Sequence, residues 1–191
     1  NKVQAVQWHR SNAWQLATGS FDKTIGLIDC RSASLSSQIS VSSDMEALCW
    51  DPFNEHLLYC SLENGMVCGI DLRQSDKPLF EFQAHNESAS SLSCSPLVPG
   101  MMATCSTDCT VKVWDMMAAT DGNGSGVPRC VGYKSMGAGK LFTVDYYSDS
   151  PFLLACGGDM GVVALWESDE LSVIDNAFSG RIVASGVGKS N

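Results

Sequence analysis

The sequence has little charge, and most of that charge is acidic. Charged residues make up 17% of the 191 residues, and 12 Lys and Arg stand against 21 Asp and Glu, a formal net charge of −9. This balance argues against direct nucleic-acid binding, which depends on cationic groups that neutralise phosphate. Few Lys and Glu beside 17 Gly also argue against a bundle of long surface helices. We therefore expect basic proteins or peptides as partners.

Long apolar runs are missing as well. No stretch approaches the roughly 18 to 20 apolar residues needed to cross a bilayer, and the start lacks the regions of a signal peptide. We expect no membrane partner. The chain begins at Asn1 inside an apolar pattern and not at a Met, so we expect the natural protein to extend further.

Metal-binding patterns are scarce. The nine cysteines include no C-x-x-C pair, and three dispersed histidines cannot complete a zinc site of recognisable spacing. An odd, scattered set of cysteines predicts free thiols in a reducing compartment. We expect the strand cysteines Cys60, Cys94 and Cys156 to be buried.

Two segments resemble ligand-binding loops without completing them. Residues 121–126 match the first positions of a calcium-binding EF-hand loop, but Gly132 stands where the bidentate Glu is needed. Residues 188–190 resemble a phosphate-binding loop, but Val183 stands where its first glycine belongs. The sequence therefore predicts a loop over residues 120–126, a flexible tail and no cofactor.

What the sequence does contain is a repeat of roughly 40 to 50 residues. Four segments share small residues, a tight acidic or Asn turn, apolar alternation and a closing acid. They cover residues 16–29, 58–71, 102–115 and 154–167. Each predicts two strands joined by a turn, which we name strands b and c.

Further strand-like runs flank these segments. A preceding strand a is predicted at residues 3–8, 45–50, 89–94 and 140–146, and a weaker fourth strand at 35–41, 79–83, 127–132 and 171–174. Four antiparallel strands per repeat predict an all-β fold of β-propeller blades. The predicted blades span residues 1–43, 44–84, 85–132 and 133–176, with a C-terminal tail over 177–191.

Short motifs carry a resemblance to a known family. Residues 113–115 (VWD) and 164–167 (ALWE) look like WD-repeat blades. Longer strings resemble the C-terminal half of the periodic tryptophan protein 1 family: residues 19–31 (GSFDKTIGLIDCR), 75–86 (SDKPLFEFQAHN), 152–158 (FLLACGG) and 173–181 (VIDNAFSGR). The resemblance implies a nuclear or nucleolar WD-repeat protein that acts in large ribosomal subunit assembly and pre-rRNA processing and is linked to chromatin.

Four blades are fewer than the seven that WD-repeat rings usually have, so we expect an open arc of a seven-bladed ring. One flank would expose Val3, Val6 and Trp8, and the other would expose residues such as Phe152, Leu165 and Trp166. Uncovered apolar faces are costly. The isolated arc should therefore self-associate or require the missing blades.

The third repeat contains a candidate structural tetrad. A WD-type blade would join His85, Thr104, Asp108 and Trp114 in a buried chain of hydrogen bonds. The competing interpretation is the Asp–His–hydroxyl triad of a propeller hydrolase. That triad needs an exposed hydroxyl beside an oxyanion hole, whereas Thr104 is predicted in mid-strand and outside a nucleophile elbow. We therefore expect a non-enzymatic protein with no small-molecule substrate.

The other repeats depart from the tetrad. Ile28 and Ile70 stand where the first and second repeats would have Trp, and Asn64 replaces the turn acid of the second. The fourth repeat has Trp166 but Cys156 in place of the hydroxyl. We expect these blades to depend more on apolar packing.

Candidate partner-binding residues lie on one rim of the blades. Phe21, Glu63 and Thr107 precede the turn positions, and Met45 and Lys140 lie where the chain enters strand a. Phe21, an aromatic beside an acid, suits an anchor for a basic peptide. The alternative is that all five are ordinary solvated turn residues. The family resemblance implies that such a rim would serve a scaffold in ribosome biogenesis, and the alternative is a histone-tail or chromatin-binding adaptor.

Overall fold

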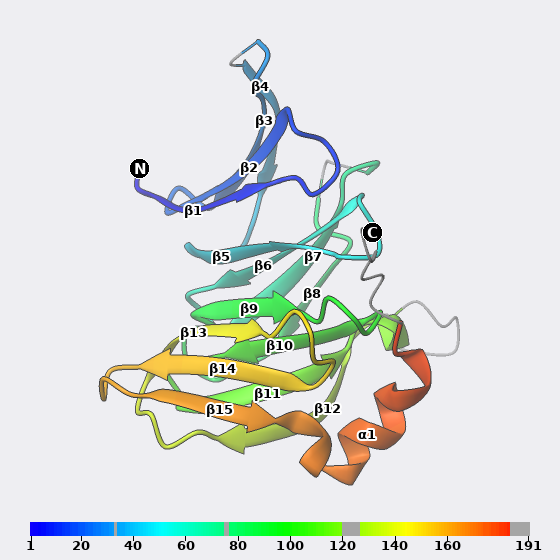
Figure 1. Ribbon diagram of the computed structural model, residues 1–191. Helices are drawn as coiled ribbons and strands as arrows, with labels where there is room; N and C mark the ends of the chain where they lie inside the picture. The colour runs from blue at the N-terminus through cyan, green and yellow to red at the C-terminus, as the bar shows by residue number, and fades with distance from the viewer. Residues whose placement is uncertain (33, 75–76, 120–126, 184–191) are drawn as a thin grey trace, which may run out of the picture.

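Four antiparallel sheets follow one another along the chain in the computed structural model, which describes residues 1–32, 34–74, 77–119 and 127–183 (Figure 1). The first sheet contains β1 (Val3–Trp8), β2 (Gln15–Ser20), β3 (Thr24–Asp29) and β4 (Ser34–Ser40). The second contains β5 (Met45–Trp50), β6 (Leu57–Leu62), β7 (Met66–Asp71) and β8 (Phe80–Gln83). The third contains β9 (Ser91–Cys94), β10 (Met101–Cys105), β11 (Thr110–Asp115) and β12 (Arg129–Ser135). The fourth contains β13 (Leu141–Tyr146), β14 (Leu153–Gly158) and β15 (Val163–Glu167). The predicted all-β fold of propeller blades is confirmed, while the seven-bladed ring stays a prediction.

The fourth strand expected at residues 171–174 is wrong. The short helix α1 (Ser172–Phe178) occupies this part of the chain, preceded by a 3-10 turn over Ser168–Glu170. Ile174 and Phe178, four residues apart on one helix face, are fully buried. Among the described residues, β15 pairs with β14 alone.

Two predicted blade boundaries are also corrected. β12 continues to Ser135 and so crosses the division expected after residue 132. α1 crosses the division expected after residue 176, and the 3-10 turn Ser179–Arg181 follows it, so the predicted tail begins as ordered structure. Residues 184–191 and the predicted loop over 120–126, with both ligand-loop resemblances, lie wholly or largely outside the described residues.

The core consists of three apolar clusters, one between each pair of neighbouring sheets. The cluster between the third and fourth sheets also takes in Ile174 and Phe178 of α1. Gly132 on β12 lets the helix approach, because a Cβ there would lie only 3.0 Å from Ile174 Cδ1. The helix thus ties the end of the fourth sheet to the outer strand of the third.

The free flanks of the stack match the open-arc expectation in part. On β1, Val3, Val6 and Trp8 are exposed, and on β15 so is Leu165. Phe152 and Trp166, which were expected on the free flank, are instead buried toward the third sheet. No helix among the described residues is long and apolar enough to cross a membrane.

The four turns between strands b and c share one conformation. In each turn an N–H donates to the carbonyl three residues earlier, and the donor residue has a positive φ. These residues are Lys23 (φ 63°), Gly65 (80°), Cys109 (69°) and Gly161 (69°). Since the same hydrogen bond and the same positive φ recur in each turn, equivalent positions of the four sheets can be assigned by counting from this residue.

Candidate functional site

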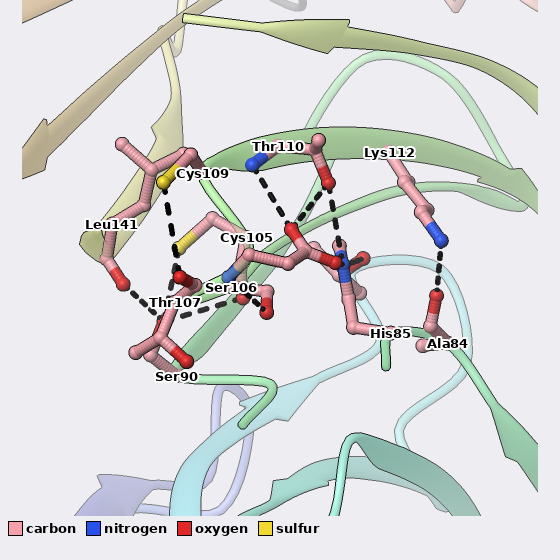
Figure 2. Close-up of polar contacts among 12 residues, drawn as sticks. Ala84, His85, Ser90, Cys105, Ser106, Thr107, Cys109, Thr110, Lys112 and Leu141 are labelled. Atoms are coloured by element: carbon pink, nitrogen blue, oxygen red, sulfur yellow. Dashed lines mark hydrogen bonds and ion pairs between the residues drawn. The ribbon is translucent and has the colours of Figure 1, made fainter. Parts of the chain in front are cut away.

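His85 lies at the centre of a hydrogen-bonded chain between the second and third sheets (Figure 2). Its Nδ1–H donates to Asp108 Oδ2 over 2.9 Å, and its Nε2 lies 2.7 Å from Thr104 Oγ1. Trp114 Nε1–H donates to the same Thr104 oxygen over 2.9 Å. The structure therefore brings all four predicted tetrad residues together.

The electrostatics of this chain favour a neutral imidazole. Burial lowers the pKa of His85, and this outweighs the opposing effect of the Asp108 carboxylate. Burial alone would raise the pKa of Asp108, but hydrogen bonds from Thr110 and His85 lower it overall. A neutral His85 with its proton on Nδ1 satisfies both neighbours, since Nε2 then accepts the Thr104 hydroxyl proton.

The burial of Thr104 argues against the alternative of a hydrolase triad. Thr104 has 0% of its surface exposed, and its oxygen already accepts the indole N–H. A nucleophile must reach its substrate, so this hydroxyl is poorly placed for catalysis. Among the described residues, no cluster of three or more His, Cys, Asp or Glu could hold a metal ion.

The loop that carries His85 is fixed to both sheets. Lys112 Nζ on β11 donates to the carbonyl oxygen of Ala84 over 2.7 Å (Figure 2), and the His85 N–H donates to Gly65 O over 3.0 Å. A Cβ on Gly65 would lie 2.2 Å from the His85 carbonyl oxygen, so this turn requires glycine. The tetrad therefore couples two sheets.

The remaining sheets lack this arrangement. Cys156 on β14 pairs with Ala164 on β15, just as Thr104 on β10 pairs with Lys112 on β11. The Cys156 thiol therefore occupies the position of the Thr104 hydroxyl. Within the described residues the buried Trp166 nitrogen makes no hydrogen bond. The pKa of the nearby Glu170 carboxyl is lowered mainly by Lys134, and the Trp166 indole contributes to this shift.

Three of the predicted rim residues occupy equivalent positions beside the turns. The N–H groups of Phe21, Glu63 and Thr107 each donate to a carbonyl of the segment that leads into strand a, at 2.9, 2.9 and 3.2 Å. Glu63 is exposed, and Phe21 and Thr107 are partly exposed. Lys140 is exposed on the same edge, where its carbonyl accepts the N–H of Asp159.

Met45 does not belong to this rim. Its side chain is fully buried between the first two sheets, beneath Gly19. It begins strand a, as Leu141 does in the fourth sheet, and both are fully buried. The equivalent of Lys140 is Asp44, one position earlier, so the prediction that Met45 contacts a partner is wrong.

Glu46 was not predicted from the sequence, yet its carboxylate interacts with Glu63, Lys2 and Asp44 on this edge. Burial raises the pKa of Glu46, and the carboxylates of Glu63 and Asp44 raise it further. Gln4 Nε2 donates to Glu46 over 3.4 Å, on the first sheet's side. Glu46 directly follows the buried Met45 in a strand, so alternation alone could have placed it outside the core.

We call Phe21, Asp44, Glu46 and Glu63 the acidic rim, because the three carboxylates influence one another and Lys2 connects them to Phe21. Lys2 connects its parts, because its Nζ lies 4.6 Å from the centroid of the Phe21 ring and its charge lowers the pKa of Glu46. The ring face is thus open to a cation. The surface can hold a positively charged side chain against an aromatic ring and three carboxylates.

Comparison with known protein families shows the class to which this protein belongs. Residues 1–29 and 76–115 match the WD domain, G-beta repeat. The chain is therefore built of WD repeats, as its four sheets and the tetrad arrangement of the third would suggest.

The relatives narrow this class. The chain is 27% identical to periodic tryptophan protein 1 of Saccharomyces cerevisiae over 86% of its own length and 30% of that protein, which confirms the family resemblance. It is 32% identical to an uncharacterized WD repeat-containing protein of Schizosaccharomyces pombe, over 76% of this chain and 27% of that one. It is 25% identical to the histone acetyltransferase type B subunit 2 of Candida glabrata, over 60% of this chain and 27% of that protein. The chain thus spans about a third or less of the length of these relatives.

Proposed function

We propose that the protein is a non-enzymatic scaffold that binds basic segments of partner proteins through the acidic rim. The observation that carries the proposal is that Lys2 lies over the Phe21 ring and also acts on Glu46, which Glu63 and Asp44 influence as well. Turns on a rigid sheet framework are suited to binding, because the sheets hold them in place. Thr107 and Lys140 extend the same edge over the third and fourth sheets.

Glu46 explains why the partner should be cationic. Its carboxylate is partly buried beside two like charges, and this raises its pKa. A Lys or Arg side chain placed there would neutralise the repulsion and gain the ring face of Phe21. Lys2 already makes this kind of contact within the chain, and a partner side chain would compete with it.

The similarity to periodic tryptophan protein 1 supports a role in ribosome biogenesis, in large subunit assembly and pre-rRNA processing, within the nucleus and nucleolus. Ribosomal proteins carry the basic segments that the acidic rim would hold. The similarity to a histone acetyltransferase subunit favours a second candidate, a chromatin adaptor that binds histone tails.

Fluorescence anisotropy with a labelled ten-residue peptide rich in Lys and Arg tests the rim. Phe21→Ala and Glu46→Gln should each weaken binding about tenfold. Asp149→Asn, an exposed acid in the loop between β13 and β14 and therefore at the other end of the strands, is the matched control and should bind as the wild type does. If both rim variants bind as tightly as the wild type, the acidic rim is not the binding surface.

A second measurement separates the two candidate roles. Peptides from basic extensions of large-subunit ribosomal proteins are compared with histone tail peptides of equal charge. Tighter binding of the ribosomal peptides supports the assembly scaffold, and tighter binding of the histone peptides supports the chromatin adaptor.

A further inference from the structure

Cys49 on β5 and Cys94 on β9 face one another between the second and third sheets. Both pack against the apolar cluster that fills this interface. Leu92, two residues before Cys94 on the same strand face, belongs to that cluster. Ser93 points the other way, where its hydroxyl donates to Asp145 of the fourth sheet over 2.8 Å. The Cys94 thiol is therefore directed toward the second sheet.

The repeat explains why the two thiols meet. Ser93 Oγ accepts the N–H of Tyr146 over 3.3 Å, which joins the third sheet to the fourth. Cys49 occupies the position of Ser93 one sheet earlier, and Cys94 that of Tyr146, so the Cys49 side chain is placed against Cys94 across the interface, close enough for each thiol to shift the pKa of the other. A small side chain that bridges neighbouring strands in one interface is thus replaced by a thiol in the other.

The two thiols have unlike acidities because of this contact. A hydrogen bond from Cys94 lowers the pKa of Cys49, and the same interaction raises the pKa of Cys94. A thiol with a lowered pKa is the more readily oxidised, and a second thiol beside it can resolve the product. Both cysteines are partly exposed, although Cys94 was expected to be buried.

The chain supplies a matched contrast in Cys60 and Cys68. These residues lie directly opposite one another on β6 and β7, so they also form a close pair. Both are fully buried, and hydrogen bonding to Cys60 together with burial strongly raises the pKa of Cys68. Proximity alone therefore does not make a reactive pair.

We propose that Cys49 and Cys94 form a reversible disulfide that links the second and third sheets when the protein meets a peroxide. The Cys49 thiolate attacks one peroxide oxygen, the O–O bond breaks, and Cys49 sulfenic acid and hydroxide form. Cys94 loses its proton to that hydroxide and attacks the Cys49 sulfur, which releases a second hydroxide. With hydrogen peroxide, two thiols and one peroxide give one disulfide and two waters. A dithiol reductant restores both thiols by exchange.

The test treats the native, reduced chain with a few equivalents of hydrogen peroxide and then blocks free thiols with N-ethylmaleimide. Mass spectrometry of the digest should find the Cys49–Cys94 link in most molecules, at least tenfold more abundant than any link that contains Cys60 or Cys68. Treatment with a dithiol should remove the link.

Two variants sharpen the result. Cys94→Ser should leave Cys49 as a sulfenic acid that dimedone traps, and Cys60→Ser should form the Cys49–Cys94 link as the wild type does. The proposal is overturned if wild-type Cys49 and Cys94 both remain free to alkylation after peroxide, or if they pair no more often than Cys60 and Cys68 do. The wild-type result decides even if a variant fails to fold.

Discussion

The third and fourth sheets bury the same tryptophan in two different ways. Trp114 donates its N–H to Thr104, and through His85 this hydroxyl is connected to Asp108. Trp166 occupies the equivalent position on β15 and is buried just as deeply, but its nitrogen makes no hydrogen bond within the described residues. The indole is thus retained while the polar chain around it is lost. Burial of the ring and satisfaction of its N–H are separable in this fold.

The two sheets also anchor their turns differently. In the third sheet the Asp108 carboxylate reaches His85, which comes from a loop attached to the second sheet. In the fourth sheet Met160 stands at the position of Asp108, one residue before the positive-φ glycine of the turn, so this sheet has no carboxylate there to make the contact. The third sheet is therefore fixed by a contact between sheets. The fourth sheet is joined to the third by other contacts, among them the hydrogen bond from Ser93 to Asp145, together with α1 and apolar packing.

The largest effect is expected from breaking the polar chain of the third sheet. Asp108→Ala or His85→Ala should lower the free energy of unfolding by about 2 to 4 kcal/mol, because each leaves buried polar partners unpaired. Asn64→Ala, at the same turn position in the second sheet, should cost clearly less. Urea denaturation measures both changes. Equal losses for Asp108 and Asn64 would contradict a stabilising role for the tetrad.

The next effect concerns the contact that holds the end of the fourth sheet. Both Arg181 guanidinium Nη atoms donate to the buried Asp115 carboxylate of the third sheet, each over 2.8 Å. Arg181→Ala should destabilise the protein by about 2 kcal/mol, because a buried carboxylate loses its main partner. Arg31→Ala removes a similar but exposed pair with Asp29 and should change the melting temperature much less. Similar shifts for the two variants would argue against the anchoring role of Arg181.

A hydroxyl in the fourth sheet should make it resemble the third. Cys156→Thr places an acceptor where Thr104 stands relative to Trp114, so we expect a gain of about 1 kcal/mol from a hydrogen bond with the Trp166 N–H. Cys156→Val has the same shape without the hydroxyl. The difference in unfolding free energy between the two variants isolates the hydrogen bond, and no difference would show that Trp166 does not need it.

The smallest effect is expected at the shared turn. Cys109 holds a positive φ that glycine adopts without strain, as Gly65 and Gly161 do. Cys109→Gly should therefore stabilise the protein by about 0.5 kcal/mol. Thr107→Gly, in the same turn but at negative φ, should destabilise it. Thermal denaturation distinguishes the two, and a loss in both would mean that the turn conformation is not strained at Cys109.

The sequence predicted the features that depend on local pattern. Strands and turns follow from alternation and from turn residues such as Asp22, Asn64 and Asp108, which recur in the first three repeats. Met45 was misplaced because a shift of one residue at the start of strand a moves a side chain from the rim to the core. α1 was missed because seven residues carry too short a period to distinguish a helix from a weak strand.

The acidic rim and the thiol pair required the third dimension. Glu46 and Glu63 lie at one end of the second sheet, and only the packing of the first sheet on the second brings Lys2 within reach of both Glu46 and Phe21. Cys49 and Cys94 likewise meet only because β5 and β9 are neighbours in the stack. Sequence spacing contains no direct sign of either contact.

The pairing of Asp115 with Arg181 has a consequence for the order of events during synthesis. The two residues are 66 positions apart, so all strands of the third sheet are complete long before Arg181 is made. Until then the Asp115 carboxylate lacks its main partner and the outer surface of β12 lacks α1. The third sheet therefore lacks these contacts while the fourth sheet is being translated. The segment from α1 to Arg181 thus completes a sheet whose strands were made much earlier.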